Sequence, residues 1–344
     1  MASVVVVGAG VTGLVTAVDC TLAGHRVTVL DRGPLPNPAS TSADHSRALR
    51  VLRPGDVPAT LRMARARRRW LALEGVLRTR VFRPVGVVTA CAPDELDAAL
   101  GTARDTGVPA VVVRQAAVPP VLLPAGTRGV LDRHAGVLLA ERFLRAATAW
   151  LAERPGVALW PGRTVVDVAE QQVTLADGTK VGADVVVVAA GPWTADLLGT
   201  PVRLHRQTTA YLRPPPRLAD WWGSAPGVGR IGADGRAWLL PPGDGALLKI
   251  SSDAVCREVG STDEADDGPW TRRLLAEPVL ADLADYRVVA VRDCHYAADP
   301  DTGGPVLTRV RPSVWSRPAC GGSGFGTAPL VADEIAAAVM EVSA

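Results

Sequence analysis

Three glycines near the N-terminus have the spacing that binds a diphosphate. Gly8, Gly10 and Gly13 form a G-x-G-x-x-G pattern between a valine run, residues 4–7, and an apolar segment, residues 14–22. The valine run predicts a buried parallel strand, and the segment after the glycines predicts a helix. The first glycine allows a tight turn, the second lets a pyrophosphate approach the backbone, and the third lets the helix pack against the strand. Free N–H groups at the helix N-terminus attract the phosphates.

An acidic residue follows the next predicted strand. Residues 26–30 form a short apolar run that ends at Asp31, eighteen residues after Gly13. An acid in this place accepts hydrogen bonds from a ribose. An ordinary glycine-rich turn would not require Asp31, so the segment predicts a dinucleotide-binding site.

A second glycine-rich loop near the C-terminus indicates which dinucleotide is bound. Residues 321–326 read GGSGFG, with Thr327 expected as the N-cap of a last helix and Pro329 in its first turn. Glycines before a helix let a ligand approach the backbone closely. The middle of the chain contains no second G-x-G-x-x-G unit. We therefore expect the second loop to close over the same cofactor, which favours a long, buried FAD.

The composition excludes several other classes of protein. The 344 residues are 48% hydrophobic with a formal charge of +2, which predicts a folded chain with no general attraction to nucleic acids or membranes. The predicted first strand begins too early for a secretory signal, and no apolar run reaches the roughly 20 residues of a membrane span. Scattered cysteines without a C-x-x-C pair argue against zinc and disulfides and favour a cytoplasmic location with no bound metal. The cysteines are Cys20, Cys91, Cys256, Cys294 and Cys320.

The elements that would position these residues are mixed helices and strands. Helices are predicted at residues 61–74 and over the polar segment 262–285, and residues 136–141 lead into an amphipathic helix that continues through 153. A second valine run, residues 185–188, leads into a turn of small residues that could approach the cofactor. The other strands are predicted at 82–90, 111–113, 157–160, 164–168, 172–175, 181–188, 211–213, 237–240, 246–250 and 286–293.

Several separated segments resemble the D-amino-acid-oxidase-like flavoproteins, and within them the monomeric sarcosine oxidase group. The segments are GAGVTGL (8–14) with Asp31, SADHSRALR (42–50), AAGPW (189–193), CHY (294–296) with Arg292 before it and Asp301 after it, and the terminal GSGFG (322–326). The resemblance covers nearly the whole chain. It implies an α/β (mixed α+β) flavoprotein of two domains, a Rossmann-like FAD-binding domain and a substrate domain with a mixed β-sheet. The FAD-binding domain would comprise residues 1–80, 126–200 and 286–344, and the substrate domain residues 81–125 and 201–285.

The resemblance also implies roles for individual residues. In sarcosine oxidases the cysteine matching Cys294 is joined to the 8α position of FAD, and the tyrosine matching Tyr296 faces the substrate. Arginines match Arg47 and Arg50 beside the flavin. The expected catalytic residues are Lys249, Arg50, Tyr296, Trp238 and Arg47. The expected cofactor-binding residues are Gly8, Gly10, Val11, Thr12, Gly13, Asp31, Arg32, Ser42, Arg47, Val165, Ala190, Gly191, Trp193, Cys294, Gly322, Gly324, Phe325, Gly326 and Thr327.

Lys249 is one of two lysines among 37 basic residues, the other being Lys180. It lies in the predicted strand 246–250, eight residues after Pro241, an interval that the family shares. In the family this lysine lies over the flavin through a water and promotes the reaction with oxygen. A positive charge in a pocket of low dielectric constant stabilises oxygen as it gains an electron. The alternative is a lysine on the wet face of a half-buried strand.

The resemblance breaks at the residues that would contact the substrate. Sarcosine-type oxidases hold the substrate carboxylate with an arginine, which is Arg50 here, and a lysine, whose position is Gly326. Asp253 replaces a family histidine and Trp238 replaces a family tyrosine. Paired family histidines are replaced by Ser42 and Ala43. We infer a different substrate, which is larger, aromatic or without a simple α-carboxylate.

The leading hypothesis is an FAD-dependent oxidase that converts the C–N bond of an amine or amino acid to an imine while O2 becomes H2O2. The alternatives are a flavin dehydrogenase that passes electrons to a carrier, an NAD(P)H-dependent monooxygenase, and a nucleic-acid binder that uses the arginine-rich helix around 62–69. His45, His205 and His295 are weaker catalytic candidates, and His295 is expected to point away from Tyr296. We expect a monomer or small homo-oligomer.

Overall fold

A mostly parallel, six-stranded sheet contains the N-terminal glycine pattern. In the computed structural model, which describes residues 1–264 and 268–343, the valine runs of β1 and β13 are buried neighbours in parallel register. This confirms the parallel strand predicted at residues 4–7 and the buried strand predicted at 185–188. Only β19 runs antiparallel to its neighbour. The strands in order across the sheet are β19 (Pro305–Arg311), β20 (Val314–Cys320), β13 (Val185–Val188), β1 (Ser3–Val7), β2 (Arg26–Leu30) and β9 (Val157–Trp160).

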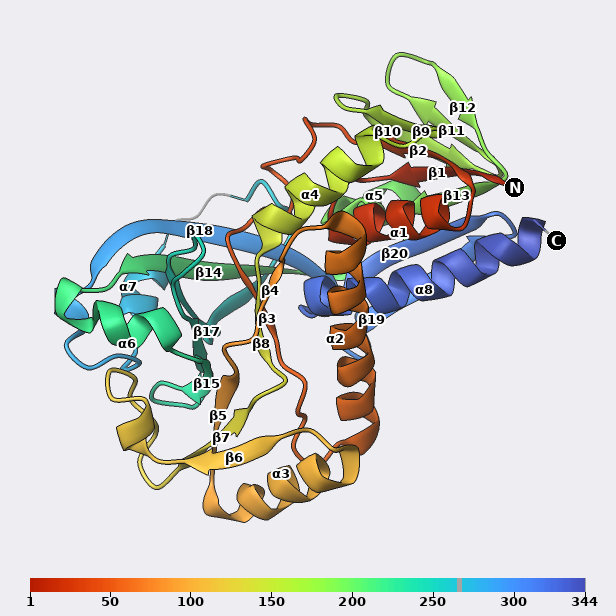
Figure 1. Cartoon of the computed structure of the whole chain (residues 1–344). Helices are drawn as coiled ribbons and strands as arrows, with labels where there is room; N and C mark the ends of the chain where they lie inside the picture. The colour runs from red at the N-terminus through yellow and green to blue at the C-terminus, as the bar shows by residue number, and fades with distance from the viewer. Residues whose placement is uncertain (265–267, 344) are drawn as a thin grey trace.

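Helices from both ends of the chain cover this sheet. Figure 1 shows α1 and α8 side by side beneath it, with the two termini close together. The arginine-rich helix α2 packs on α8, and Arg69 pairs with Asp19 of α1 at 2.7 Å and with Asp333 of α8 at 2.6 Å. Those two contacts hold the three helices together. The α-helices are α1 (Val11–Leu22), α2 (Val57–Leu77), α3 (Pro93–Thr106), α4 (Ala140–Ala152), α5 (Thr194–Leu198), α6 (Ala219–Ser224), α7 (Trp270–Leu275) and α8 (Gly324–Ser343).

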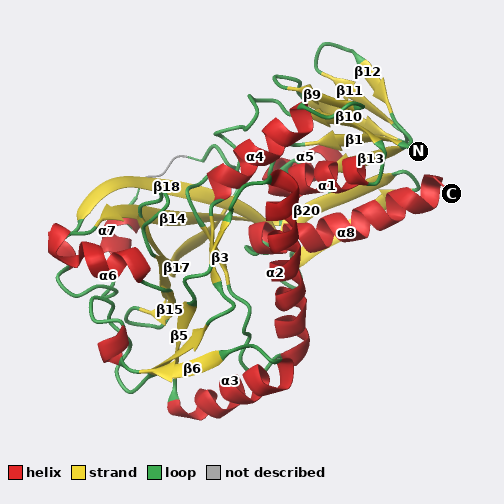
Figure 2. Ribbon diagram, in the orientation of Figure 1, coloured by secondary structure: helices red, strands yellow, loops and turns green. Residues whose placement is uncertain are grey.

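An eight-stranded mixed sheet forms the other main layer. Its neighbouring strands are antiparallel except β15 and β5, and its buried face includes Ile231, Leu239 and Ile250. Figure 2 shows the long strands β14 and β18 extending from this sheet toward β20 and α8. The strands in order are β18 (Arg287–Ala298), β14 (Arg203–Arg213), β17 (Leu248–Val259), β16 (Ala237–Leu240), β15 (Gly227–Ile231), β5 (Val87–Cys91), β7 (Arg128–Asp132) and β6 (Ala110–Val113).

Two three-stranded sheets complete the fold. The first matters for the site because it contains β3, which carries Arg47. Together the sheets confirm the predicted mixed α/β class. The division into two domains stays a prediction, and β7 and β18 join the eight-stranded sheet although that division places them with the FAD-binding part. The small sheets are β3 (Arg47–Leu49), β8 (Gly136–Leu138) and β4 (Phe82–Arg83), and β10 (Val165–Ala169), β11 (Gln172–Leu175) and β12 (Lys180–Gly182).

Some predicted elements differ from the structure. The single strand expected over 82–90 is divided into β4 and β5, because Gly86 between them has a φ of +76°. The strand expected over 211–213 extends over all of β14, residues 203–213. Within the described part of 262–285, helix is confined to α7 and a 3-10 turn at Leu283–Asp285, since Pro278 stops α7 from continuing. Residues 265–267 of that prediction lie outside the described residues.

The start of α8 also differs from the prediction. The helix begins at Gly324, so Thr327 lies inside its first turn instead of at the N-cap. There the Thr327 hydroxyl donates to the carbonyl of Ser323 at 3.0 Å. Pro329 is likewise inside the helix. None of the helices in residues 1–264 and 268–343 is long and apolar enough to cross a membrane.

Candidate active site

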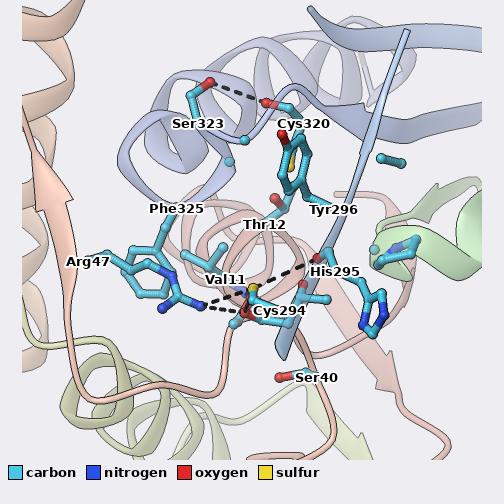
Figure 3. A pocket seen from close by; sticks show the side chains of 18 of the residues that line it. Val11, Thr12, Ser40, Arg47, Cys294, His295, Tyr296, Cys320, Ser323 and Phe325 are labelled. Atoms are coloured by element: carbon cyan, nitrogen blue, oxygen red, sulfur yellow. Dashed lines mark hydrogen bonds between the residues drawn. The ribbon is translucent and has the colours of Figure 1, made fainter. Parts of the chain in front are cut away.

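A cavity of about 1000 Å³ lies between the glycine-rich turns and the eight-stranded sheet. Figure 3 shows a pocket bordered by side chains from the N-terminal helix, from β18 and from the loop before α8. Most of the predicted site residues line the cavity. They are Gly8, Gly10, Val11, Thr12, Asp31, Arg32, Ser42, Arg47, Arg50, Val165, Ala190, Gly191, Trp193, Trp238, Lys249, Cys294, Tyr296, Gly322, Gly324, Phe325 and Gly326.

Two predicted cofactor residues do not line the cavity. Gly13 holds α1 against β1, because a Cβ atom there would lie 1.9 Å from the carbonyl oxygen of Gly8. Thr327 is buried in the first turn of α8. Both are therefore placed to support the cavity wall without facing the cavity.

The N-terminal turn is shaped for close approach of a ligand. Gly8 has a φ of +101°, and a Cβ atom there would lie 2.5 Å from the carbonyl oxygen of Ala189. The backbone N–H of Val11 donates to the Ser42 hydroxyl at 3.0 Å, so the segment after β2 closes over the start of α1. These features fit a bound dinucleotide, since the turn has room only for glycine and the helix N-terminus faces the cavity.

Asp31 is held by protein donors on both oxygen atoms. Its carboxylate accepts hydrogen bonds from the N–H of Ala9 at 2.8 Å, the N–H of Gly33 at 2.9 Å and the Asn37 side chain at 2.8 Å. Oδ1 accepts two of these bonds, whereas Oδ2 accepts only one and can accept a further bond. Asp31 therefore ties the ends of β1 and β2 together and still lines the cavity where a ribose would lie.

The buried ammonium of Lys249 forms an ion pair that the sequence analysis missed. Its Nζ lies 2.5 Å from Oδ2 of Asp44 and donates to the carbonyl of Ser46 at 3.3 Å. The Tyr211 hydroxyl donates to the other Asp44 oxygen at 2.7 Å, and Arg47 also pairs with this carboxylate. The cluster of Lys249, Asp44 and Arg47 thus has two cations and one anion, a net charge of +1.

The environment of Lys249 is largely dry. The residue is 4% exposed, and burial together with the neighbouring Arg47 lowers the pKa of its ammonium well below the ordinary value. The Asp44 carboxylate opposes this effect, because an opposite charge in contact favours the charged form. Nζ also lies 5.5 Å from the centre of the Trp238 ring and 5.9 Å from that of Tyr211. Lys249 therefore does not lie on the wet face of a half-buried strand, and that alternative is wrong.

Arg47 connects this cluster to Cys294. Its Nη2 donates to the carbonyl of Thr41 at 2.6 Å and lies 3.8 Å from the Cys294 sulfur. Cys294 is half-buried on β18, and Figure 3 shows its sulfur beside the Arg47 guanidinium.

Arg50 and Trp238 define the end of the cavity at the eight-stranded sheet. Arg50 follows β3 and extends over β15, where its Nη1 would lie 3.8 Å from a Cβ atom on Gly229. The Arg50 side chain is exposed to the space of the cavity, but protein surrounds that space. This burial lowers the pKa of Arg50, and the charge of Asp253 raises it. Burial also raises the pKa of Asp253, whose carboxyl faces Arg236 and Arg50. This end thus presents cationic groups and a single carboxyl beside an aromatic ring.

Tyr296 is positioned by a second aromatic contact. Its ring stacks on His205 with 5.0 Å between centroids, and its hydroxyl lies 3.4 Å from the Cys256 sulfur. Burial raises the pKa of Tyr296 above its ordinary value, so the phenol stays protonated. Figure 3 shows Tyr296 and His295 on different sides of β18, the alternation expected of neighbours in a strand.

The C-terminal glycine loop is held in place by Trp70 of α2. Trp70 of α2 donates from Nε1 to the carbonyl of Gly326 at 3.0 Å, and its ring stacks on Phe325 at 5.6 Å. On the opposite side of the cavity, the Arg32 guanidinium lies 3.9 Å from the Trp193 ring centre. These contacts hold parts of the cavity wall in place.

The functional residues that sequence reasoning missed are those whose partners come from distant segments. Asp44 and Tyr211 hold Lys249, and Arg53 lines the cavity beside Arg50. Asp44 stands three residues before Arg47, a weak signal that the sequence contained. Nothing local marked Tyr211 or Arg53.

A parallel sheet with this glycine turn at the end of its first strand defines a dinucleotide-binding fold. The chain belongs to the FAD-dependent oxidoreductase family, whose sequence model matches residues 3–338.

Individual proteins resemble the chain in sequence or in fold. The chain is 28% identical to the peroxisomal sarcosine oxidase of Mus musculus over 212 residues, which are 56% of this chain and 51% of the relative. The match thus spans about half the length of that protein. A modified fructosyl peptide oxidase from Aspergillus nidulans superposes with a TM-score of 0.81 at 18% identity, covering 99% of this chain and 91% of the other. An L-proline dehydrogenase from P. horikoshii has a TM-score of 0.80 at 18% identity, covering 98% and 93%.

Proposed function

We propose that the protein oxidises the C–N bond of an amine or amino acid to an imine and reduces O2 to H2O2. The observation that carries this proposal is the buried, charge-paired ammonium of Lys249 in the wall of the cavity. The reaction balances as one amine and one O2 giving one imine and one H2O2. When bound, FAD supplies the two-electron acceptor for the amine.

The substrate would lie at the end of the cavity nearest the eight-stranded sheet. Arg50 has no hydrogen bond or ion pair with any described residue and can bind a carboxylate. Trp238 and Tyr296 supply apolar walls, and the protonated Tyr296 phenol can donate a hydrogen bond. A substrate amine that binds in its neutral form needs no strong base, which suits this set of residues.

Lys249 would act on the oxygen half of the reaction. Its positive charge, held by Asp44, stabilises the negative charge that O2 acquires during reduction. Arg47 lies in the same cluster and adds to the field. Because Asp44 offsets one of the two cations, the same contact also supports a second candidate, a dehydrogenase that passes electrons to another acceptor.

Cys294 is our candidate for covalent attachment of FAD. The support comes from the resemblance of the CHY segment and from the sulfur's place in the cavity wall, 3.8 Å from Arg47. Acid-denatured protein is expected to stay yellow and to show the added mass of one FAD. Flavin that separates completely into the supernatant would refute the linkage.

The substrate is proposed to differ from sarcosine. Gly326 stands where sarcosine-type oxidases have a lysine, and a Cβ atom there meets only ordinary contacts, the nearest being Leu49 at 3.5 Å. The position therefore tolerates a side chain. Gly326→Lys is expected to gain sarcosine oxidation, whereas rapid turnover of sarcosine by the unaltered protein would contradict the proposal.

The decisive experiment mixes the holoenzyme anaerobically with primary, secondary and cyclic amino acids and amines, and follows bleaching of the flavin. Air is then admitted and H2O2 is measured. Bleaching by an amine followed by stoichiometric H2O2 is the expected result. Bleaching without H2O2 would favour the dehydrogenase, and reduction only by NAD(P)H would favour a monooxygenase.

The remaining proposals concern organisation. We propose that the six-stranded sheet binds FAD and that the eight-stranded sheet contacts the substrate. A cytoplasmic location and a monomeric or small homo-oligomeric state stay predictions. Cell fractionation and light scattering would test them.

A further inference from the structure

Two arginines at the substrate end of the cavity lack partners. Neither Arg50 nor Arg53 makes a side-chain hydrogen bond or ion pair with any residue in 1–264 or 268–343. Both line the main cavity, and both also line an adjoining cavity of about 330 Å³. The two guanidiniums therefore lie where the two spaces meet.

The carboxylates around Arg53 are used elsewhere. Asp132 accepts four backbone N–H groups, from Val51 and Leu52 on one oxygen and His134 and Ala135 on the other. Its carboxylate therefore fixes the backbone just before Arg53.

Other acids near the adjoining cavity are also engaged or distant. Asp56 caps α2 by accepting from the N–H of Ala59 at 2.9 Å. Glu95 pairs with Arg230 at 2.8 Å. Asp94 lines the adjoining cavity but forms no ion pair within 4 Å with Arg53. The positive charge of Arg53 thus has no contacting counterion among the described residues.

The two guanidiniums oppose each other electrically. Burial lowers the pKa of Arg53, and the nearby charge of Arg50 lowers it further. Arg236, which pairs with Asp234 at 4.0 Å, adds a third cation to the cavity wall, and the carboxyl of Asp253 faces both Arg236 and Arg50. Like charges that share one cavity wall repel each other, and an anionic ligand bound between them would relieve that repulsion.

We infer that the substrate carries two acidic groups, one bound by Arg50 and the second by Arg53. The substrate class is an amino acid with a second carboxylate, and its distal end extends toward the adjoining cavity. The carboxyl of Asp253, which faces Arg50, is placed to accept a hydrogen bond from the substrate nitrogen. The inference rests on the proposed amine oxidation for the identity of the reacting group, while the two-anion site rests on the arginines alone.

The test uses ligands that cannot be oxidised. Acetate, butyrate, succinate and glutarate are titrated into the holoenzyme, and the dissociation constant of each is read from the perturbation of the FAD absorption spectrum. We expect the dicarboxylates to bind at least tenfold more tightly than the monocarboxylates. Arg53→Gln should weaken succinate or glutarate by 10-fold to 100-fold and leave acetate within twofold, whereas Arg53→Lys should retain part of the preference.

The matched control is Arg230→Gln, which removes a charge from the adjoining cavity but from a residue already paired with Glu95. It should change the binding of neither ligand class by more than about twofold. Equal binding of mono- and dicarboxylates by the unaltered protein would overturn the inference. The inference would also fail if Arg53→Gln weakened the binding of monocarboxylates and dicarboxylates equally. Arg50 and Arg53 would then both bind the same carboxylate.

Activity provides a separate readout. N-methylaspartate and N-methylglutamate are compared with N-methylalanine in anaerobic flavin bleaching. If no amine bleaches the flavin but glutarate binding depends on Arg53, amine oxidation fails and the two-anion site stands. If N-methylalanine bleaches the flavin as readily as the dicarboxylates do, amine oxidation stands and the inference fails.

Discussion

Replacing Asp44 by asparagine tests the electrostatic role assigned to Lys249. The substitution keeps the shape of the side chain and removes the charge that lies 2.5 Å from the Lys249 ammonium. Two unit charges at this distance attract by about 7 kcal/mol at an effective dielectric constant of 20. Desolvation offsets part of that, and removing one partner of a buried pair costs about 3–5 kcal/mol.

Lys249 can escape this cost by losing its proton. Burial and Arg47 already lower the pKa of Lys249, and Asp44 is the group in contact that opposes them. In Asp44→Asn the pKa of Lys249 is therefore expected to fall further, so the lysine loses its proton at a lower pH than in the unaltered protein. The rate of reoxidation of the reduced enzyme by O2 should fall on the order of 100-fold, the loss typical of removing one stabilising charge or donor from an active site.

The pH dependence distinguishes this mechanism from simple damage. Lowering the pH returns the proton to Lys249, so the O2 rate of Asp44→Asn should rise as the pH falls. The free energy of unfolding of Asp44→Asn should change with pH in the opposite direction to the O2 rate. The folded pKa of Lys249 lies below its unfolded value of about 10.4, so the unfolded chain binds more protons between the two and stability rises with pH. The deficit in unfolding free energy should therefore be largest at acidic pH and shrink as the pH rises toward the unfolded pKa.

Stopped-flow mixing of reduced enzyme with O2 measures the rate, and chemical denaturation measures the stability. Asp19→Asn is the matched control, because it removes the partner of Arg69 far from Lys249. Lys249→Met and the double variant with Asp44→Asn complete a double-mutant cycle. In this cycle the double variant should react with O2 no more slowly than Lys249→Met alone. Reoxidation of Asp44→Asn at the unaltered rate across pH 6–9, or strictly additive losses in the double variant, would refute the reasoning.

Four further variants give predictions, three of them at or beside the cofactor site. Cys294→Ser should release its flavin on acid denaturation, as measured by absorbance of the supernatant, while the unaltered protein retains it. Gly13→Ala should destabilise the fold by at least about 3 kcal/mol and lower flavin content, because its Cβ would lie 1.9 Å from a backbone oxygen. Gly75→Ala, in open space within α2, should instead stabilise by about 0.5–1 kcal/mol in the same denaturation assay. Trp70→Phe removes the hydrogen bond to Gly326 and should cost about 1–3 kcal/mol in thermal unfolding.

Local pattern was enough to predict the parallel core of the fold. The buried valines of β1 and β13 and the glycine turn after β1 follow from spacing alone, because burial on both faces requires a continuous apolar run. The extent of β14 could not be read in this way. Its polar residues, such as Arg206 and Gln207, are stabilised by cross-strand and side-chain partners from β17 and β18. The same limit applied to 262–285, where a polar sequence suggested more helix than Pro278 allows.

The sequence by itself determined the dinucleotide-binding turn, since Gly8, Gly10 and Gly13 act through backbone geometry within one short segment. Only the tertiary structure decided which charges meet in the cavity. Asp44 and Lys249 are 205 residues apart and come together because the segment before β3 lies against β17. The isolation of Arg53 was equally invisible in sequence. Whether a charge is paired depends on the distance to every other charge, and the chain sets those distances only when it folds.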